Sequence, residues 1–108
     1  FKNAFNGLIW SLKTQPNYRV HLSLSFLAMV LGFWLKISYT EFLMIIFLIM
    51  VGLVIETINT AIESTTDAID TKIREDIRIS KDVSAAAMLI YAVGATIIAL
   101  MIFVPKVI

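Results

Sequence analysis

Residues 42–67 have the sequence FLMIIFLIMVGLVIETINTAIESTTD, which decides the fold of this chain. The first part of the stretch, Phe42–Ile55, contains no charged residue. In the second part, polar side chains recur at spacings of three, four and four residues, so they share one face of a helix. Isolated carboxylates are costly in or near hydrocarbon, so a polar face on an apolar helix predicts a functional site. The face comprises Glu56, Asn59, Glu63 and Asp67.

The composition of the 108-residue chain is that of a membrane protein. Hydrophobic residues make up 59% and charged residues 16% of it, and the mean hydropathy is +0.88. A soluble domain of this size lacks the interior to bury so much apolar surface. We therefore predict an all-α integral membrane protein with a single domain over residues 1–108, because unpaired strands cannot cross lipid. The net charge of +1, without a basic stripe, argues against nucleic acid as a partner.

Uncharged runs and their flanks predict three membrane-spanning helices. The second helix is expected to continue into the cytoplasm to about residue 70, because the helical pattern extends through the polar face. A cytoplasmic loop over residues 70–80 then precedes the third span, with Ser80 as its N-cap and Asp82 in its first turn. The predicted spans are residues 20–38, 41–62 and 82–105.

Apolar residues also recur at helical spacing within residues 1–14, before the first span. They predict an amphipathic helix that lies in the membrane interface and ends near Gln15, because Pro16 disfavours a helical residue before it. The alternative is a solvated helix that packs on the cytoplasmic loop. The chain begins at Phe1 rather than Met, so we expect further residues before it.

The distribution of lysine and arginine predicts the orientation of the spans. Seven of these residues fall on one side of the predicted membrane, and Lys36 and Lys106 fall on the other. Because the cytoplasmic side carries the excess of positive charge, the N-terminus is expected inside and the C-terminus outside. The seven are Lys2, Lys13, Arg19, Lys72, Arg74, Arg78 and Lys81.

The polar face straddles the predicted cytoplasmic boundary of the membrane. At ~1.5 Å per residue from Glu41, Glu56 lies ~22 Å and Glu63 ~33 Å along the helix, against ~30 Å of hydrocarbon. Glu56 is then accessible from the lipid and Glu63 from water, as needed to join a membrane alcohol to a soluble phosphate donor. The alternative is a helix end with a solvated polar face, which we favour for Asp67 and Asp70 alone.

Phosphoryl transfer also requires cations at the phosphates. Carboxylates can hold Mg²⁺, while Lys81, Arg74 and Arg78 are candidates for pairing with phosphate or are simply part of the positive cytoplasmic side. The sequence has no glycine-rich phosphate loop, so a nucleotide site would not be of the P-loop type. We interpret His21, the one histidine, as an interfacial polar anchor rather than a catalytic base.

Three segments of the chain form a specific combination. The polar face, Glu56-Thr-Ile-Asn59-Thr-Ala-Ile-Glu63-Ser-Thr-Thr-Asp67, is followed by Lys81-Asp82-Val-Ser-Ala-Ala-Ala and preceded by Asn17-Tyr-Arg-Val-His21. Together they resemble the motifs of the prokaryotic diacylglycerol kinase and undecaprenol kinase family. The resemblance covers the whole chain, because the spacing of the motifs, the length and the three-span layout also agree.

The resemblance implies a homotrimeric enzyme of the bacterial inner membrane that moves the γ-phosphate of MgATP onto a lipid hydroxyl. The residue matching Glu56 acts as general base, and the one matching Asn59 supports the site. The residue matching Glu63 binds the metal, and the interfacial helix closes a site that neighbouring subunits share. The residues expected to contact or lie near the nucleotide are Glu63, Lys81, Asp82, Arg74 and Asn3.

The chain departs from the family pattern at Gln15, where the family usually carries a second metal-binding glutamate. Gln15 is therefore the expected second metal ligand, although its amide oxygen adds no negative charge. We expect weaker metal binding, unless Glu75 or Asp76 substitutes for the missing carboxylate. Asn3 stands where the family often has an aromatic residue.

Two other functions are compatible with these residues. In an ion-coupled transporter or channel subunit, Glu56 would bind a proton or cation. In a non-catalytic assembly protein, the acidic cytoplasmic face would dock a partner, and Gln15 would mark a decayed site. Within the kinase interpretation, undecaprenol and diacylglycerol are both candidate acceptors, and the Asn-x-Arg-x-His segment is more typical of the Gram-positive, undecaprenol type.

Overall fold

The computed structural model describes residues 1–69 and 75–108. Within these two ranges the chain forms four helices and no strand, which confirms the all-α prediction. The helices are α1 (Lys2–Thr14), α2 (Pro16–Leu35), α3 (Tyr39–Ile69) and α4 (Glu75–Val107).

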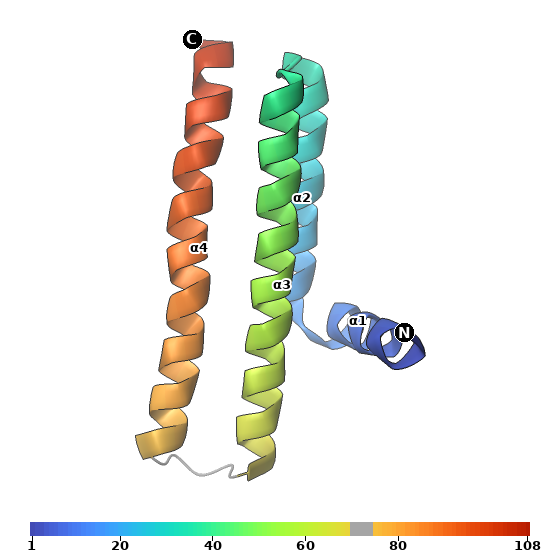
Figure 1. Cartoon of the computed structure of the whole chain (residues 1–108), viewed down its shortest axis with the longest axis vertical. Helices are drawn as coiled ribbons and strands as arrows, with labels where there is room; N and C mark the ends of the chain where they lie inside the picture. Colours follow the sequence, from blue (N-terminus) through green and yellow to red (C-terminus); the bar gives the residue numbers. More distant parts are fainter. Residues whose placement is uncertain (70–74) are drawn as a thin grey trace.

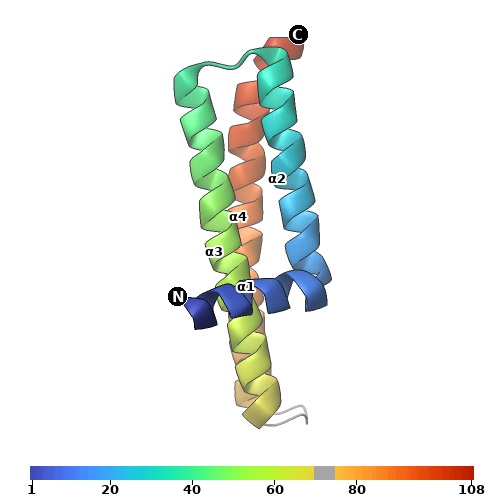
Figure 2. The same ribbon diagram turned by 90° about the vertical axis from the view of Figure 1, so that its right-hand side faces the viewer.

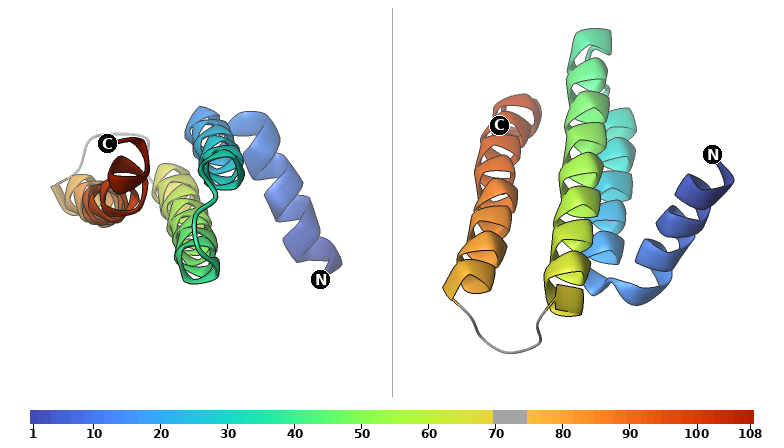
Figure 3. Two further views of the ribbon diagram at one scale, coloured as in Figure 1. Left: turned by 90° about the horizontal axis from the view of Figure 1, so that it is seen from above. Right: turned by 60° about the horizontal axis from the view of Figure 1, so that its bottom comes forward.

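The three long helices lie side by side, and each runs antiparallel to the one before it (Figure 1). Helix α1 lies across this bundle at the end where α2 begins, rather than along it (Figure 2). Seen from above, α1 diverges from the long helices (Figure 3). Helices α2, α3 and α4 are long and apolar enough to cross a membrane, in agreement with the three predicted spans. The interfacial position of α1 stays a prediction.

Helix α3 is longer than the hydrocarbon of a bilayer is thick. Its 31 residues extend about 46 Å at 1.5 Å per residue, against ~30 Å of hydrocarbon. The uncharged residues lie in the first part of α3, so the excess length falls at the end that carries the polar face. The position of the polar face at the membrane boundary stays a prediction, and the length of α3 is sufficient for it.

The break between α1 and α2 falls where the sequence predicts it. Gln15 is extended, with φ −108° and ψ 106°, and Pro16 is the first residue of α2. Proline suits this position because the first helical N–H has no intrahelical partner and the φ of proline is already helical. The backbone N–H of Gln15 bonds to the carbonyl of Ser11 at 2.9 Å, which closes α1. The Gln15 side chain is thereby placed at the corner between the two helices.

The connection between α2 and α3 is short and capped on both sides. Lys36 adopts the left-handed conformation, φ 55° and ψ 50°, and ends α2. The Ser38 backbone N–H donates to Glu41 Oε1 at 2.8 Å, and the Glu41 N–H donates to Ser38 Oγ at 3.2 Å, which forms a capping box. Glu41 also pairs with Lys106 of α4 at 3.3 Å, so the end of α4 is tied to this corner.

The predicted loop over residues 70–80 is wrong from residue 75 onward, because α4 begins at Glu75. Ser80 is consequently an interior residue of α4 and not its N-cap. The acidic pair Glu75 and Asp76 occupies the first turn, where negative charge interacts favourably with the helix dipole. Residues 70–74 of the predicted loop lie outside the described residues.

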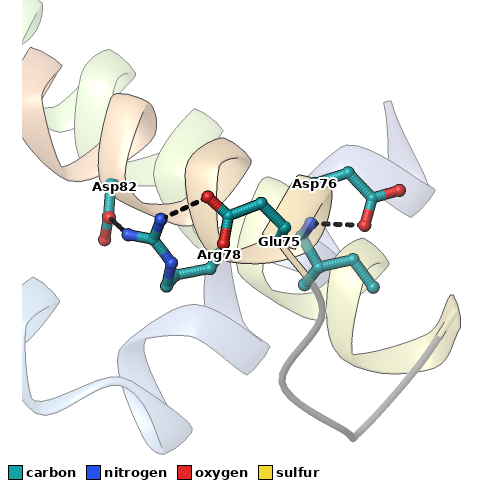
Figure 4. Close-up of polar contacts among 5 residues, drawn as sticks. Glu75, Asp76, Arg78 and Asp82 are labelled. Carbon is teal, nitrogen blue, oxygen red and sulfur yellow. Dashed lines mark hydrogen bonds and ion pairs between the residues drawn. The ribbon is translucent and has the colours of Figure 1, made fainter.

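Ion pairs on the surface of α4 support this early start (Figure 4). The Arg78 guanidinium bonds to Glu75 at 2.7 Å and to Asp82 at 3.0 Å. These are the i,i+3 and i,i+4 spacings at which side chains meet on a helix, and each such pair adds a few tenths of a kcal/mol. Ser80, the predicted N-cap, is therefore preceded by a helical turn that these ion pairs stabilise.

The chain buries few of its own apolar side chains. A small core of Ile37, Ile45 and Ile102 forms where the α2–α3 connection meets the last turns of α4. In the apolar window of α4, 6% of the residues are buried. So much exposed apolar surface requires lipid or further protein around the bundle.

Candidate active site

The polar face of α3 passes from buried to exposed along the helix. Glu56 is 5% exposed and Asn59 is 9% exposed, whereas Glu63 is an exposed residue. Thr60, beside Asn59, is also buried. The interpretation as a solvated polar face therefore does not describe Glu56, which is enclosed by the bundle.

Asn59 connects α4 to the Glu63 carboxylate. Its Oδ1 accepts a hydrogen bond from the buried hydroxyl of Ser84, and its Nδ2 donates to Glu63 Oε1 at 3.1 Å. Because both ends of the amide are engaged, Asn59 holds one carboxylate oxygen of Glu63 in a defined position.

Sequence analysis missed Ser84 as a site residue. The hydroxyl comes three residues after Lys81, in a segment whose other members are valine and alanine. A single polar side chain one helical turn after a candidate phosphate ligand was the signal that could have identified it.

A cavity of about 700 Å³ lies between α2, α3 and α4. Glu56, Asn59 and Glu63 form its polar edge on α3, and His21 and Tyr91 line it from α2 and α4. The remaining lining is mainly apolar and includes Leu24, Ile49, Met88 and Phe103. A long apolar chain with one polar end matches this combination of lining groups.

The structure places His21 between the helices, in contrast to the interfacial anchor that the sequence suggests. Its ring lies 5.8 Å from that of Tyr91, centroid to centroid, with an interplanar angle of 39°. The Tyr91 hydroxyl donates to the backbone carbonyl of Leu48 at 2.6 Å. The imidazole is thus packed against Tyr91, and His21 forms part of the wall of the large cavity.

A second cavity, of about 310 Å³, lies between α1 and α3. Gln15, Glu63 and Asp67 line it together with three neighbouring side chains, Trp10, Thr60 and Ser64. The two predicted metal ligands, Gln15 and Glu63, are therefore brought to the same cavity. Glu63 lines both cavities and stands at their junction.

The lining of the smaller cavity suits Mg²⁺ bound together with a phosphate ligand. Its oxygen donors are the carboxylates of Glu63 and Asp67 and the amide of Gln15, and Mg²⁺ prefers oxygen ligands. Among the described residues no group of three or more His, Cys, Asp or Glu side chains converges into a complete protein cage. Mg²⁺ in phosphoryl-transfer sites commonly takes one or two carboxylates and completes its shell with water and phosphate oxygens. The donor set fits that role.

The predicted nucleotide ligands are only partly assembled around this cavity. Lys81 forms an ion pair with Asp67 and so lies at its edge. Asp82 is exposed and pairs with Arg78, and it lines neither cavity. Asn3 is exposed on α1 and also lines neither cavity. Arg74 lies outside the described residues.

The carboxylates suggested as substitutes at Gln15 are not beside it. Glu75 pairs with Arg78, and the Asp76 carboxylate accepts a hydrogen bond from the Ile77 N–H at 2.9 Å. Neither residue lines the cavity that contains Gln15. Within the described part of the chain, Asp67 is the acidic residue that accompanies Glu63 there.

Comparison with known proteins identifies the family of this chain. The family model described as prokaryotic diacylglycerol kinase matches residues 2–103. The chain is 36% identical to undecaprenol kinase of Bacillus subtilis over 107 residues, which cover 98% of this chain and 86% of that protein. It is 26% identical to diacylglycerol kinase of Synechocystis sp. over 99 residues, which cover 91% of this chain and 57% of that protein. The chain therefore belongs to the prokaryotic diacylglycerol kinase family, whose members are lipid kinases.

Proposed function

We propose that this protein transfers the γ-phosphate of MgATP to the hydroxyl of a membrane lipid alcohol. The observation that carries the proposal is the position of Glu63 at the junction of two unlike cavities. One cavity is mainly apolar and contains Glu56, and the other is polar and contains Gln15 and Asp67. A lipid hydroxyl and a phosphate donor bound in these cavities would meet at the polar face of α3.

On the acceptor side, Glu56 acts as general base. Its carboxylate takes the proton from the lipid hydroxyl as the oxygen attacks the γ-phosphorus, and the bond from that phosphorus to the leaving ADP oxygen breaks. The burial of Glu56 keeps water away from the reacting oxygen, which limits competing hydrolysis of ATP.

On the donor side, Glu63 and Gln15 would hold the metal, and Asp67 and Lys81 form the edge of the site. Bound Mg²⁺ would neutralise charge on the transferred and leaving phosphates. Asn59 keeps the Glu63 carboxylate in place through its bond to Ser84, so α4 helps to position the donor. Most of the catalytic effect in such a reaction comes from positioning and electrostatic stabilisation. We propose that Asp82, Arg74 and Asn3 contact or lie near the bound nucleotide.

We favour undecaprenol over diacylglycerol as the acceptor. The relative named undecaprenol kinase is more similar to this chain, and its match covers more of both proteins. The large cavity supports either alcohol, because its lining is mainly apolar along the length of the helices.

The proposed assembly is a homotrimer with the N-terminus inside and the C-terminus outside the cytoplasmic membrane. The exposed apolar surface of α4 supports an oligomer, and small residues would permit close approach of its helices. A Cβ atom added at Gly94 would meet nothing within 4 Å, so this face is open in the single chain. Ala86 and Ala87 are further small residues of α4 that line neither cavity, whereas Ala85, Ala95 and Ala99 line the large one.

The test is a phosphotransfer assay with purified protein in mixed micelles, labelled ATP and Mg²⁺, with undecaprenol and dioleoylglycerol supplied in turn. Glu56→Gln should lower kcat by about 100-fold or more, because a general base typically contributes 10²–10⁴-fold. Glu41→Gln makes the same chemical change at the opposite end of α3, where glutamine preserves the capping box, and should retain activity. Wild-type turnover by Glu56→Gln would contradict the role of Glu56.

Ion flux into liposomes separates this proposal from the transporter alternative. A lipid kinase labels its acceptor and gives no ATP-independent flux, whereas an ion-coupled transporter gives flux and consumes no ATP. Flux without lipid labelling would replace the kinase proposal.

A further inference from the structure

The imidazole of His21 contains a buried polar atom with no bonding partner. Its Nε2 is inaccessible to solvent and makes no hydrogen bond with any described residue. Buried polar groups in folded proteins are nearly always hydrogen-bonded, because an unmet donor or acceptor away from water is costly. Because the His21 side chain lines the large cavity, a rotation of its imidazole ring would expose Nε2 and let it bond to whatever occupies that cavity.

The backbone of α3 places His21 one helical turn from Glu56. A Cβ atom added at Gly52 would collide with the rings of both His21 and Tyr91, so these rings lie directly over Gly52. Glu56 follows Gly52 by four residues, about 6 Å along the same face of α3. Side chains on a helix lean toward its N-terminus, so Glu56 leans toward the turn that His21 covers.

The other polar side chain packed on this turn already has a partner. The Tyr91 hydroxyl is bonded to the Leu48 carbonyl, which leaves His21 Nε2 as the unmet group beside Glu56. His21 and Glu56 line the same cavity. An imidazole and a carboxylate thus line one cavity.

We propose that His21 is a substrate-binding residue that recognises the hydroxyl of the lipid alcohol. The Nε2–H donates a hydrogen bond to the hydroxyl oxygen, while the hydroxyl donates its own hydrogen to the Glu56 carboxylate. This pair of bonds uses the donor and one acceptor of the hydroxyl and leaves an oxygen lone pair for attack on the γ-phosphorus. The inference rests on the proposed lipid kinase function and adds to it the group that selects an alcohol over other lipids.

The single histidine allows this contact to be observed directly. Protein labelled with ¹⁵N-histidine gives the two nitrogen signals of one imidazole, so Nε2 has to be distinguished only from Nδ1 of the same ring. Undecaprenol and dioleoylglycerol are added in turn at fixed pH, and their matched controls without a hydroxyl are undecaprenyl acetate and trioleoylglycerol. The Nε2 resonance should shift with at least one alcohol and not with its ester. The proposal is overturned by an equal shift with both members of each pair. It is equally overturned by no shift at all, as would be found if a second copy of the chain filled the cavity.

Kinetics supply an independent readout. His21→Leu should lower kcat/KM for the lipid by about 10- to 100-fold, as expected for the loss of one hydrogen bond to a charged or reacting group, while KM for ATP stays unchanged. His21→Gln keeps an N–H donor and should recover part of the loss. Ser23→Ala removes an exposed hydroxyl from the same helix and should behave as wild type. Wild-type kcat/KM for the lipid in His21→Leu would overturn the proposal.

The two experiments distinguish this inference from the function on which it rests. Suppose that the wild-type protein phosphorylates a lipid alcohol, but the Nε2 resonance does not shift and His21→Leu keeps the wild-type kcat/KM for the lipid. The kinase proposal then stands and the role of His21 is overturned. If the Nε2 resonance shifts only with alcohols but no lipid is phosphorylated, alcohol recognition by His21 stands and the kinase proposal fails.

Discussion

At the scale of single residues, the bonds of Asn59 explain why a neutral amide lies between two glutamates. A carboxylate at this position would lose the donor that reaches Glu63 and would place a fourth negative charge on the same helix face. The amide instead links the Ser84 hydroxyl to Glu63, so two helices set the orientation of one carboxylate.

The hydrogen bond from Ser84 to Asn59 gives a prediction about how the Glu63 carboxylate is positioned. Ser84→Ala removes the donor to Asn59 Oδ1, and we expect Mg²⁺ affinity to fall about 10-fold, in the range found when an outer partner of a metal ligand is removed. Activity should recover at higher Mg²⁺, and KM for the lipid should not change. The measurement is phosphotransfer as a function of Mg²⁺ concentration. Ser80→Ala, on the exposed surface of the same helix, is the matched control. A loss that excess Mg²⁺ cannot restore would contradict the role.

Gln15 gives the second prediction at this scale. Because Gln15 and Glu63 line one cavity, Gln15→Glu adds a negative charge where the metal is proposed to bind. We expect the Mg²⁺ concentration for half-maximal activity to fall at least several-fold, since carboxylates bind Mg²⁺ more strongly than amides. Thr14→Glu places the same charge one residue away, on an exposed side chain, and should have a smaller effect. Equal effects of the two substitutions would show that general electrostatics, and not ligation, is responsible.

At the scale of the helices, Gly52 allows α2 and α4 to approach the same turn of α3. Gly52→Ala would drive a methyl group into the rings of His21 and Tyr91, so we expect stability in detergent to fall by about 1–3 kcal/mol, as in other overpacked cores. Gly7→Ala is the matched control, because a Cβ atom there meets nothing within 4 Å. That substitution should be neutral or stabilising by up to about 1 kcal/mol through helix propensity. Chemical unfolding followed by circular dichroism checks both variants, and unchanged stability in Gly52→Ala would show that the rings can move aside.

The helix boundaries show which local signals carry information. Pro16 and the extended residue before it place the α1–α2 break correctly, because proline restricts its own φ and the preceding residue. The predicted start of α4 at Ser80 was wrong, because the acidic first turn and the ion pairs of Arg78 stabilise an earlier start at Glu75. A serine N-cap and an acidic first turn are both local signals, and here the acidic turn marks the start of the helix.

At the scale of the whole molecule, the exposed apolar surface of α4 predicts an oligomer. Gly94→Leu adds bulk on a face that is open in the single chain, so monomer folding should be unaffected while assembly is weakened. Native mass spectrometry in mild detergent should show trimers for the wild type and a shift to monomers for the variant. Gly7→Leu, on α1, is the control and should remain trimeric. Trimers of unchanged stability in Gly94→Leu would place the interface elsewhere.

The sequence by itself determined the helical class, the three apolar spans and the order of Glu56, Asn59 and Glu63 along one helix. These properties depend on hydropathy and on the period of a helix, which act over neighbouring residues. The greater membrane depth of Glu56 than of Glu63 stays a prediction, while within the bundle Glu56 is buried and Glu63 is exposed.

Only the tertiary structure decided which side chains from other helices meet that face. The crossing of α1 brings Gln15 to Glu63, the packing over Gly52 brings His21 beside Glu56, and α4 supplies Ser84. The relative rotation and height of packed helices depend on how their side chains interlock, and no period within a single helix specifies this. For that reason the sequence predicts His21 as a polar anchor at the membrane interface, whereas in the folded chain His21 lines a cavity between the helices.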